Sequence, residues 1–461
     1  MLGRLYLAIE RWARANSGRL DAVCPHVPLW FVRRLSEAKL VRTLRYVWRH
    51  SALQRERWQE AGVRRGDLRS PDVLQRLPLL TGKEIVEHPE RLFCVPRERF
   101  THIIGSSGTT GPHKTIYLTA EDMARQTRMI GTFYRNFPGV KRAAVWMLLE
   151  DESWSAGSIT RDSFRRGEID VIMASTSRSV EEQVALLRDG HIDMIQSTPP
   201  YIHRIALESD TPVREFGVRY ICLAGMPFTE EFRRRMEETW GAKIMDTYGG
   251  AETACGMASE CRFQDRLHVT EVDYWVEIID AQTGRVLPDG EEGEIVITTL
   301  SRQGMPLVRY RTADIAALVP RGKRCPCGLP LRKMTRVRGR NDDMLNIGTG
   351  DNVFPDELDQ AVFSVPDVTD YQLVVEKDAY RDVLHLTVES NSAVEGLREP
   401  LRSALMSINS IGKSVRLTKT VAIDRIEVVP PGALAAGRPK SRRIVDRRAG
   451  ATVGVSFVGV K

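Results

Sequence analysis

Residues 106–115 read Ser106-Ser107-Gly108-Thr109-Thr110-Gly111-Pro112-His113-Lys114-Thr115. The glycines let backbone N–H groups turn toward an anion with no Cβ in the way. The hydroxyl groups add donors and Lys114 adds a point charge. The stretch follows a short apolar strand predicted at 101–104, although it lacks the spacing of a Walker loop. We therefore expect a polyphosphate-binding loop; the alternative is a flexible surface loop.

Around this loop, apolar runs and helical patterns alternate. From Phe100 we expect a strand, then the loop, then a helix. Continuous apolar runs at 143–149, 170–173 and 194–197 are typical of buried strands, and a helical segment at 180–187 separates the last two. Such alternation predicts an α/β fold with parallel strand pairing.

The flanking regions differ from this pattern. Residues 1 to about 65 show helical spacing, and Thr81 with Glu84 forms a predicted capping box. Beyond Val269 a mainly antiparallel section is expected. After Arg340 a smaller α+β domain is expected. The predicted segments are strands at 274–279, 293–299 and 315–319, then helices at 355–362 and 397–406, strands at 370–375 and 383–389, and an extended segment at 415–429.

Composition and charge limit the classes of protein to which the chain can belong. With 461 residues, 42% hydrophobic and 28% charged, the chain is expected to form two or three globular domains. No stretch approaches the roughly 18–20 apolar residues of a membrane helix, and the N-terminus lacks the apolar core of a signal peptide, so a cytoplasmic location is expected. The net charge of +7 includes a basic run from Arg438 to Arg448. Without a nucleic-acid-binding module, we attribute this charge to phosphate-bearing small molecules and expect no nucleic-acid partner.

Seven cysteines, an odd number, argue against a framework of disulfides alone. Cys325 and Cys327 form a tight C-x-C knuckle, and Cys261 and His268 lie upstream. Three thiolates and an imidazole would make a closed, structural Zn²⁺ site. Cys255 could replace Cys261, and unligated cysteines are the alternative reading.

Several stretches, in order, resemble the adenylate-forming (acyl-CoA synthetase) superfamily and, within it, the phenylacetate–CoA ligase branch. The phosphate loop resembles its S-S-G-T-T-G-x-P-x, with Pro112 one position early. Similarity runs from about Lys39 to Arg448 and leaves about residues 1–38 uncovered. The other matching stretches are Tyr248-Gly249-Gly250-Ala251-Glu252, Tyr310-Arg311-Thr312-Ala313-Asp314, Arg336-Val337-Arg338-Gly339-Arg340-Asn341-Asp342-Asp343-Met344, Asn352-Val353-Phe354-Pro355 and Gly437-Arg438-Pro439-Lys440. The branch often carries the same C…H…C-x-C pattern as Cys261, His268, Cys325 and Cys327.

The resemblance implies a large N-terminal AMP-binding domain over 1–341, with parallel and mixed sheets, and a small mobile α+β lid over 342–461. It implies that ATP and Mg²⁺ activate a carboxylic acid to an acyl-adenylate. The acyl group would then pass to the thiol of coenzyme A.

The resemblance also implies roles for single residues. Glu252 would hold Mg²⁺ and Lys440 would be the adenylation lysine, both catalytic. Asp342 would be the hinge of the lid. The nucleotide-binding residues would be Ser106, Ser107, Gly108, Thr109, Thr110, Gly111, Lys114, Tyr248, Asp314 and Arg340.

Two departures from the family pattern leave the substrate and the activity open. Ala251 replaces a hydroxyl residue, and Met226 stands where glutamate is common. Aromatic and sulfur side chains favour an aryl acid; the candidate lining residues are Trp146, Trp154, Tyr201, Met226 and Tyr248, of which Trp146 and Met226 taken singly are better read as core. Transfer to a carrier-protein thiol or an amine is the nearest alternative, and a degenerate nucleotide-binding scaffold is an alternative from another class. The oligomeric state is open, with a homodimer as a guess.

Overall fold

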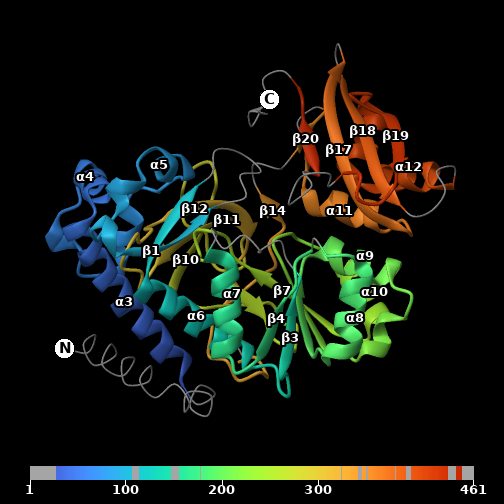
Figure 1. Cartoon of the computed structure of the whole chain (residues 1–461). Helices are drawn as coiled ribbons and strands as arrows, with labels where there is room; N and C mark the ends of the chain where they lie inside the picture. Colours follow the sequence, from blue (N-terminus) through green and yellow to red (C-terminus); the bar gives the residue numbers. More distant parts are fainter. Residues whose placement is uncertain are drawn as a thin grey trace, which may run out of the picture.

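The computed structural model describes residues 27–105, 114–146, 155–176, 178–322, 324–340, 345–348, 351–378, 381–390, 396–434 and 443–448. Figure 1 shows a large body, which contains the N-terminal helices and most strands, and a smaller body built from the C-terminal strands and helices. Within the described ranges, no helix is long and apolar enough to span a bilayer. Seven of the candidate site positions lie outside these ranges: Ser106 to Gly111 and Lys440. The hinge candidate Asp342 also lies outside them.

The first described segment is helical, as expected. Helices α3 (Leu29–His50) and α4 (Ala52–Glu60) are separated at Ser51, whose side chain accepts a hydrogen bond from the Gln54 backbone N–H. Helix α5 (Gly82–Glu87) begins at the predicted capping box, since the Glu84 carboxylate accepts from the Thr81 backbone N–H at 2.8 Å. These helices pack against the large body at its edge (Figure 1).

An eight-stranded mixed sheet forms the centre of the large body. Five strands run parallel and continue into three short antiparallel strands at one edge. In spatial order the strands are β13 (Lys333–Met334), β9 (Leu267–Val269), β8 (Ala258–Glu260), β7 (Lys243–Tyr248), β6 (Tyr220–Ala224), β5 (Met194–Ser197), β3 (Arg142–Val145) and β4 (Asp170–Met173). Strands β4 and β5 match their predicted bounds, and the α/β architecture is confirmed.

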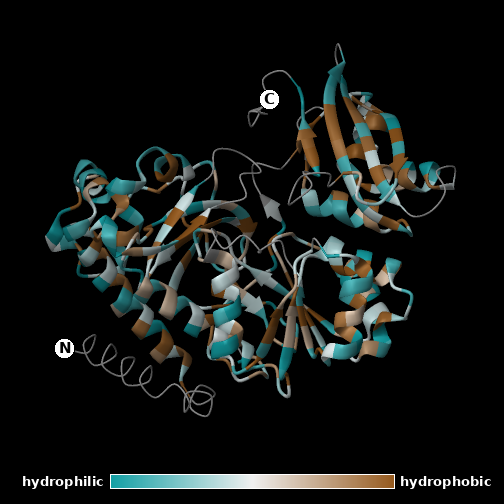
Figure 2. Cartoon of the chain, viewed as in Figure 1, coloured by the Kyte–Doolittle hydropathy of each residue, from teal (hydrophilic) through white to brown (hydrophobic). Residues whose placement is uncertain are grey.

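Helices cover both faces of the parallel strands. On one face, α8 (Val180–Gly190), α9 (Pro199–Glu208) and α10 (Glu230–Trp240) bury an apolar cluster around Trp146 and Trp240. On the other, α6 (Ala120–Tyr134) and α7 (Ser155–Arg166) bury a cluster around Tyr134 and Phe164. In Figure 2 the central strands are accordingly hydrophobic, whereas the outer faces of the helices are hydrophilic.

A second sheet of the large body is antiparallel, in the order β10 (Tyr274–Ile279), β11 (Gly293–Thr299), β12 (Tyr310–Ala316) and β14 (Gly339–Arg340). The strand predicted at 315–319 is wrong in its bounds, because β12 starts five residues earlier, at Tyr310. The expected order of strand, loop and helix from Phe100 also needs correction. After β1 (Phe100–Gly105) and the loop comes β2 (Thr115–Thr119), which pairs back on β1 before α6 begins. Alternating apolar and polar residues in β2 suit this two-stranded ribbon.

The smaller body has an apolar core of its own, drawn entirely from residues 345–444. Its sheet has the order β19 (Val421–Val429), β18 (Arg381–Ser390), β17 (Val368–Asp378) and β20 (Ile444–Asp446), with helices α11 (Pro355–Phe363) and α12 (Arg398–Ser407). A hairpin, β15 (Leu345–Ile347) and β16 (Asp351–Val353), precedes α11. The extended segment predicted at 415–429 is wrong at its start: α13 (Asn409–Lys413) continues through a turn to Thr418, and Lys419 has a left-handed φ of 57°.

Side chains on α11 meet the large body near β14. The Arg338 guanidinium pairs with Asp356 (Nε–Oδ2 2.9 Å) and lies 4.4 Å from the centre of the Phe354 ring. Further along α11, Phe363 faces Phe232 of α10 with ring centres 6.5 Å apart. The predicted division at residues 341–342 falls between Arg338 and Asp356, and it stays a prediction.

Candidate active site

The carboxyl end of β7 carries the Tyr248–Glu252 motif. In open α/β sheets, ligands bind at the carboxyl ends of the parallel strands. After Tyr248 the chain folds into a compact loop over residues 249–256. This loop lies beside strand β12 of the antiparallel sheet and beside Lys114. The stretches that begin at Ser106, Tyr248 and Tyr310 therefore come together here.

Tyr248 and Asp314 touch directly. The Tyr248 hydroxyl donates a 2.6 Å hydrogen bond to Asp314 Oδ2, and this contact joins β7 of the mixed sheet to β12 of the antiparallel sheet. Burial, and then the nearby Asp314 charge, raises the pKa of the Tyr248 phenol well above its ordinary value. The phenol therefore remains a hydrogen-bond donor near neutral pH.

Glu252 and Lys114 form a second pair. The Glu252 carboxylate is buried, and its Oε1 lies 3.8 Å from Lys114 Nζ. Lys114 also donates a 2.7 Å hydrogen bond to the hydroxyl of Tyr310, a buried residue at the start of β12. A hard divalent cation prefers carboxylate oxygen, and a lysine suits a phosphate. Their juxtaposition can therefore serve a metal-bound polyphosphate.

The loop that carries Glu252 is tightly folded. A Cβ on Gly249 would lie 2.7 Å from the backbone of Gly256, so only glycine fits there. Ala254 and Cys255 have left-handed φ values of 50° and 73°. A strained backbone of this kind persists only where contacts with the surrounding structure hold it in place.

Two residues that the sequence did not single out, Gln126 of α6 and Tyr274 of β10, hold this loop. Gln126 Nε2 donates to the carbonyl oxygens of Thr253, Ala254 and Gly256, and the Tyr274 hydroxyl lies 2.7 Å from the Thr253 carbonyl oxygen. A polar residue on the inward face of an amphipathic helix was the available signal for Gln126. Tyr310 was also missed, although it opens its motif.

The remaining nucleotide candidate, Arg340, is placed through its backbone. Strand β14 pairs with β12 so that Arg340 stands opposite Asp314. Ala313, which directly precedes Asp314, has a left-handed φ of 65°. Ala251 is buried in the largest apolar cluster.

Among the candidate acyl-pocket residues, Trp146 and Tyr201 belong to the core between the sheet and α8–α10. Their rings meet edge to face with centres 5.9 Å apart, and Tyr201 accepts a hydrogen bond from Gln183. Trp154 lies outside the described residues.

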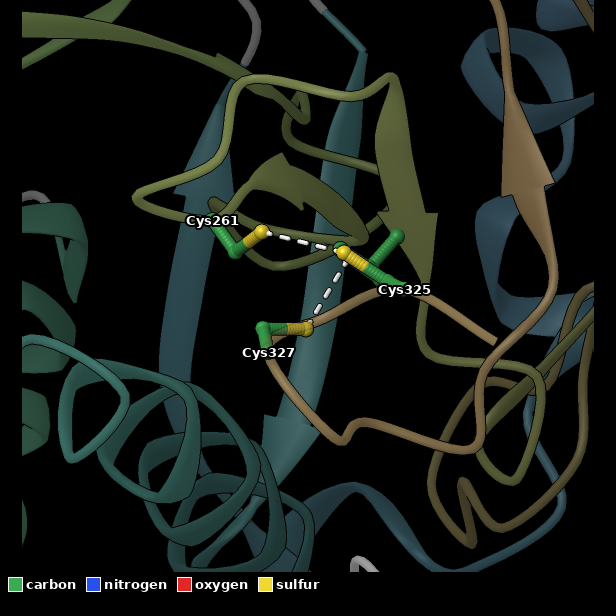
Figure 3. Close-up of side chains that lie close together, drawn as sticks. Cys261, Cys325 and Cys327 are labelled. Carbon is green, nitrogen blue, oxygen red and sulfur yellow. Dashed lines mark hydrogen bonds between the residues drawn. The ribbon is translucent and has the colours of Figure 1, made fainter. Parts of the chain in front are cut away.

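The four predicted metal ligands come together. Figure 3 shows the thiols of Cys261, Cys325 and Cys327 converging, and one ligand atom from each of these cysteines and from His268 lies within 4.8 Å of all the others. Cys261 Sγ is 3.6 Å from Cys325 Sγ, and Cys327 Sγ is 3.5 Å from His268 Nε2. Cys255 is not part of this cluster.

The two shorter separations, 3.6 Å and 3.5 Å, fit a tetrahedral ion. With Zn–S bonds of about 2.3 Å and Zn–N bonds of about 2.0 Å, tetrahedral ligand atoms lie about 3.5–3.8 Å apart. A disulfide would need a separation of about 2.0 Å. Hydrogen bonding by Cys327, outweighing the effect of burial, lowers the pKa of the Cys261 thiol to about 4, while that same contact raises the pKa of Cys327. The direction of this pKa shift favours the thiolate form of Cys261, which is the form that binds metals.

Similarity to known proteins spans most of the chain. A family model described as AMP-binding enzyme matches residues 33–301, and a model of the AMP-binding enzyme C-terminal domain matches residues 350–448. The phenylacetate-coenzyme A ligase of Pseudomonas putida is 30% identical over 414 residues, which cover 88% of this chain and 92% of that protein. The phenylacetate-coenzyme A ligase of Aromatoleum evansii is 28% identical over 433 residues, 90% of this chain and 94% of that protein.

A solved structure shares the fold. The crystal structure of 2-hydroxyisobutyryl-CoA ligase in the postadenylation state, in complex with 2-HIB-AMP, superposes with a TM-score of 0.77 at 20% identity, covering 91% of this chain and 90% of that one.

Proposed function

This chain belongs to the family of AMP-binding enzymes, and from that premise we propose that it is an AMP-forming acid–CoA ligase. It activates a carboxylic acid with ATP to an acyl-adenylate and then forms a thioester with coenzyme A. The observation that carries this is the convergence of two pairs, Tyr248 with Asp314 and Lys114 with Glu252, at the carboxyl end of β7. The similarity to phenylacetate-coenzyme A ligases along about nine-tenths of the chain supports the same reaction.

In the first half-reaction a carboxylate oxygen of the acid attacks the α-phosphorus of ATP. The new O–P bond forms as the bond to pyrophosphate breaks. Both reactants are anions, so cationic groups must offset their repulsion. Lys114, fixed by Tyr310, supplies one such charge beside the phosphates.

Glu252 is the residue that would hold Mg²⁺. Its carboxylate is buried with a lysine 3.8 Å away rather than a close salt bridge, which leaves oxygen available as a ligand. The ion, when bound, neutralises phosphate charge and supports departure of pyrophosphate. Asp314 accepts hydrogen bonds from ribose hydroxyls, and Tyr248 orients that carboxylate.

In the second half-reaction the sulfur of coenzyme A attacks the acyl carbon and AMP leaves. Lys440 as the adenylation lysine, Asp342 as the hinge, the loop Ser106–Gly111 as the phosphate cradle and the Arg340 side chain at the ribose or phosphate side remain proposals from the sequence. So does the division into a domain over 1–341 and a mobile lid over 342–461.

We propose an aryl acid as the substrate class, because the relatives act, by name, on phenylacetate. Coenzyme A is the proposed acceptor for the same reason. Transfer to a carrier protein or an amine, a homodimer and a cytoplasmic location stay predictions.

We further propose that Cys261, His268, Cys325 and Cys327 hold one structural Zn²⁺. Four protein ligands would leave no position for substrate, so the ion would link the chain segments between β8 and β13.

The test is acid-dependent release of pyrophosphate from ATP and Mg²⁺, over a panel of aryl and aliphatic acids, with and without coenzyme A. Aryl acids should turn over, with completion to AMP and thioester only when coenzyme A is present. Pyrophosphate release that ignores coenzyme A would assign the acceptor to a carrier protein or an amine. Silence across the panel from folded protein would contradict the ligase and favour the scaffold reading suggested by Ala251 and Met226.

Lys440→Ala separates the half-reactions. It should abolish pyrophosphate release and leave thioester formation from a supplied acyl-adenylate. Loss of both activities in a folded variant would contradict the role proposed for Lys440.

A further inference from the structure

Gln126 makes an unusual set of contacts below the Glu252 loop. It lies on α6 with 7% of its surface exposed. Its Nε2 donates to the carbonyl oxygens of Thr253 (2.9 Å), Ala254 (2.9 Å) and Gly256 (2.8 Å). One side-chain amide therefore binds three of the four residues that follow Glu252.

The orientation of this amide is fixed by its partners. All three backbone atoms are acceptors, so the nitrogen must face them. On the opposite side, the Tyr274 hydroxyl lies 2.9 Å from Gln126 Oε1 and 2.7 Å from the Thr253 carbonyl oxygen. A carboxamide nitrogen has only two hydrogens, so with three acceptors one hydrogen is shared between two carbonyl oxygens.

The loop needs this support because its backbone is strained. Ala254 and Cys255, both with left-handed φ, turn successive carbonyl groups inward toward α6. Without Gln126, the Ala254 and Gly256 carbonyl oxygens would lose this donor, while that of Thr253 would keep the Tyr274 hydroxyl, and an unpaired carbonyl oxygen is costly in a low-dielectric interior. A side chain without an N–H group cannot make these hydrogen bonds.

The opposite side of the loop faces the candidate active site. Glu252 immediately precedes the clamped residues, and its carboxylate lies 3.8 Å from Lys114 Nζ. We propose that Gln126 is a positioning residue, which fixes the Glu252 carboxylate for binding Mg²⁺–ATP by clamping the loop 249–256 from behind. The part concerning Mg²⁺ rests on the proposed function, whereas the clamp itself does not.

The experiment compares Gln126→Met with Gln54→Met in the full-length protein. Gln54 is a matched control, since it is also buried and its Nε2 also donates to a backbone carbonyl, that of Pro306, at 3.0 Å. The first measurement is hydrogen exchange of peptides covering 249–257, which requires no catalysis. Gln126→Met should speed exchange there by about tenfold or more, whereas Gln54→Met should leave these peptides unchanged.

The second measurement is the Mg²⁺ dependence of pyrophosphate release. Gln126→Met should raise the half-saturating Mg²⁺ concentration by about tenfold and lower kcat for adenylation. Thioester formation from a supplied acyl-adenylate should stay within about twofold of wild type, a split that general destabilisation would not produce.

Gln126→Glu adds a signature in pH. An ionised carboxylate would face three carbonyl oxygens. At pH 8 this variant should therefore show faster exchange over 249–257 and a higher half-saturating Mg²⁺ concentration than Gln126→Met. At pH 6 a protonated carboxyl group can donate one hydrogen bond, so part of the loss should be recovered relative to wild type.

Unchanged exchange over 249–257 in Gln126→Met would overturn the clamp. Faster exchange with an unchanged Mg²⁺ requirement would overturn the link to Glu252. A wild-type protein that releases no pyrophosphate would defeat the proposed function alone, because the exchange result still decides the clamp.

Discussion

The hydroxyl of Tyr248 donates a 2.6 Å hydrogen bond to the Asp314 carboxylate. The two residues belong to different sheets, and both come from sequence motifs. The contact consumes one lone pair on Oδ2 and leaves other acceptor positions on the carboxylate, so Asp314 can bind the phenol and a ribose at the same time.

This relationship predicts how Asp314→Ala should respond to altered nucleotides. In the wild type, 2′-deoxy-ATP or 3′-deoxy-ATP should lower kcat/KM by about tenfold, as expected for loss of a hydrogen bond to a charged group. In Asp314→Ala, kcat/KM for ATP should already be lower than in the wild type. Replacing ATP by the corresponding deoxy-ATP should then lower kcat/KM no further. Steady-state kinetics with the three nucleotides check this, and additive losses would show that Asp314 does not contact the ribose.

Tyr310→Phe should weaken the hold on Lys114. The variant removes the acceptor of the 2.7 Å bond from Nζ while keeping the buried ring. We expect KM for ATP to rise by about three- to tenfold, in line with a net worth of about 0.5–1.5 kcal/mol for one hydrogen bond. Tyr46→Phe, which loses a 2.9 Å bond to the Gln303 carbonyl, is the control and should keep the wild-type KM. Equal KM values in both variants would argue against a positioning role.

Removal of the metal ligands should destabilise the large body. Cys325→Ser should lose the one zinc expected per chain, measured by elemental analysis, and lower Tm, whereas Cys94→Ala should retain zinc because Cys94 is a buried thiol outside the cluster. Metal content should also fall in acid, since thiolates and a neutral imidazole are needed for binding. Wild-type protein that carries no zinc, as purified or after reconstitution, would contradict the site.

His203 should make stability depend on pH. Its ring is 3% exposed on α9, and neither nitrogen finds a hydrogen-bond partner among the described residues. Burial, followed by the charge of Arg235, lowers its pKa from 6.5 to about 4. The folded state therefore prefers the neutral ring, and its contribution is present above pH 6.5 and lost as the pH falls toward 4.

Between pH 7.5 and pH 5, this one group should cost about 2 kcal/mol of unfolding free energy. His203→Leu should remove that increment, as measured by urea denaturation at the two pH values. A wild-type pH dependence that survives in the variant would assign it to other groups.

Ala313→Gly should stabilise the protein. Ala313 holds a left-handed φ of 65° in β12, a conformation that costs a residue with a Cβ about 1–2 kcal/mol. After the entropy cost of glycine, a gain of about 0.5–1 kcal/mol remains. Ala316→Gly, in the same strand without that φ, should instead destabilise. A destabilised Ala313→Gly variant would show that this backbone is not strained.

The sequence predicted those elements whose signals are local. The buried strands β4 and β5 came from apolar runs, and the start of α5 from its capping box. The segment 414–418 was missed because its apolar spacing also suits a strand, and what decides it is the packing of α13. The sequence also predicted that Tyr248 and Asp314 belong to one site and that Cys261, His268, Cys325 and Cys327 lie together, whereas the roles of these residues stay predictions.

What could not be predicted depends on contacts between distant segments. Gln126 and Thr253 are 127 positions apart, and Lys114 and Tyr310 are 196 apart. Neither pairing leaves a trace in local periodicity, because each is produced by the way the sheets pack. Trp146 shows the converse: its aromatic character suits a substrate pocket, yet burial makes it part of the core.

The bridge from Arg338 to Asp356 and Phe354 has a consequence for how easily the two bodies can separate. The charged groups are each about 30% exposed, and such ion pairs contribute about 0–1 kcal/mol, with a similar amount from the ring contact. The smaller body has its own apolar core, so its fold does not depend on this bridge. Contacts of this size would add only a small barrier to the lid motion that the sequence predicts, and that motion stays a prediction.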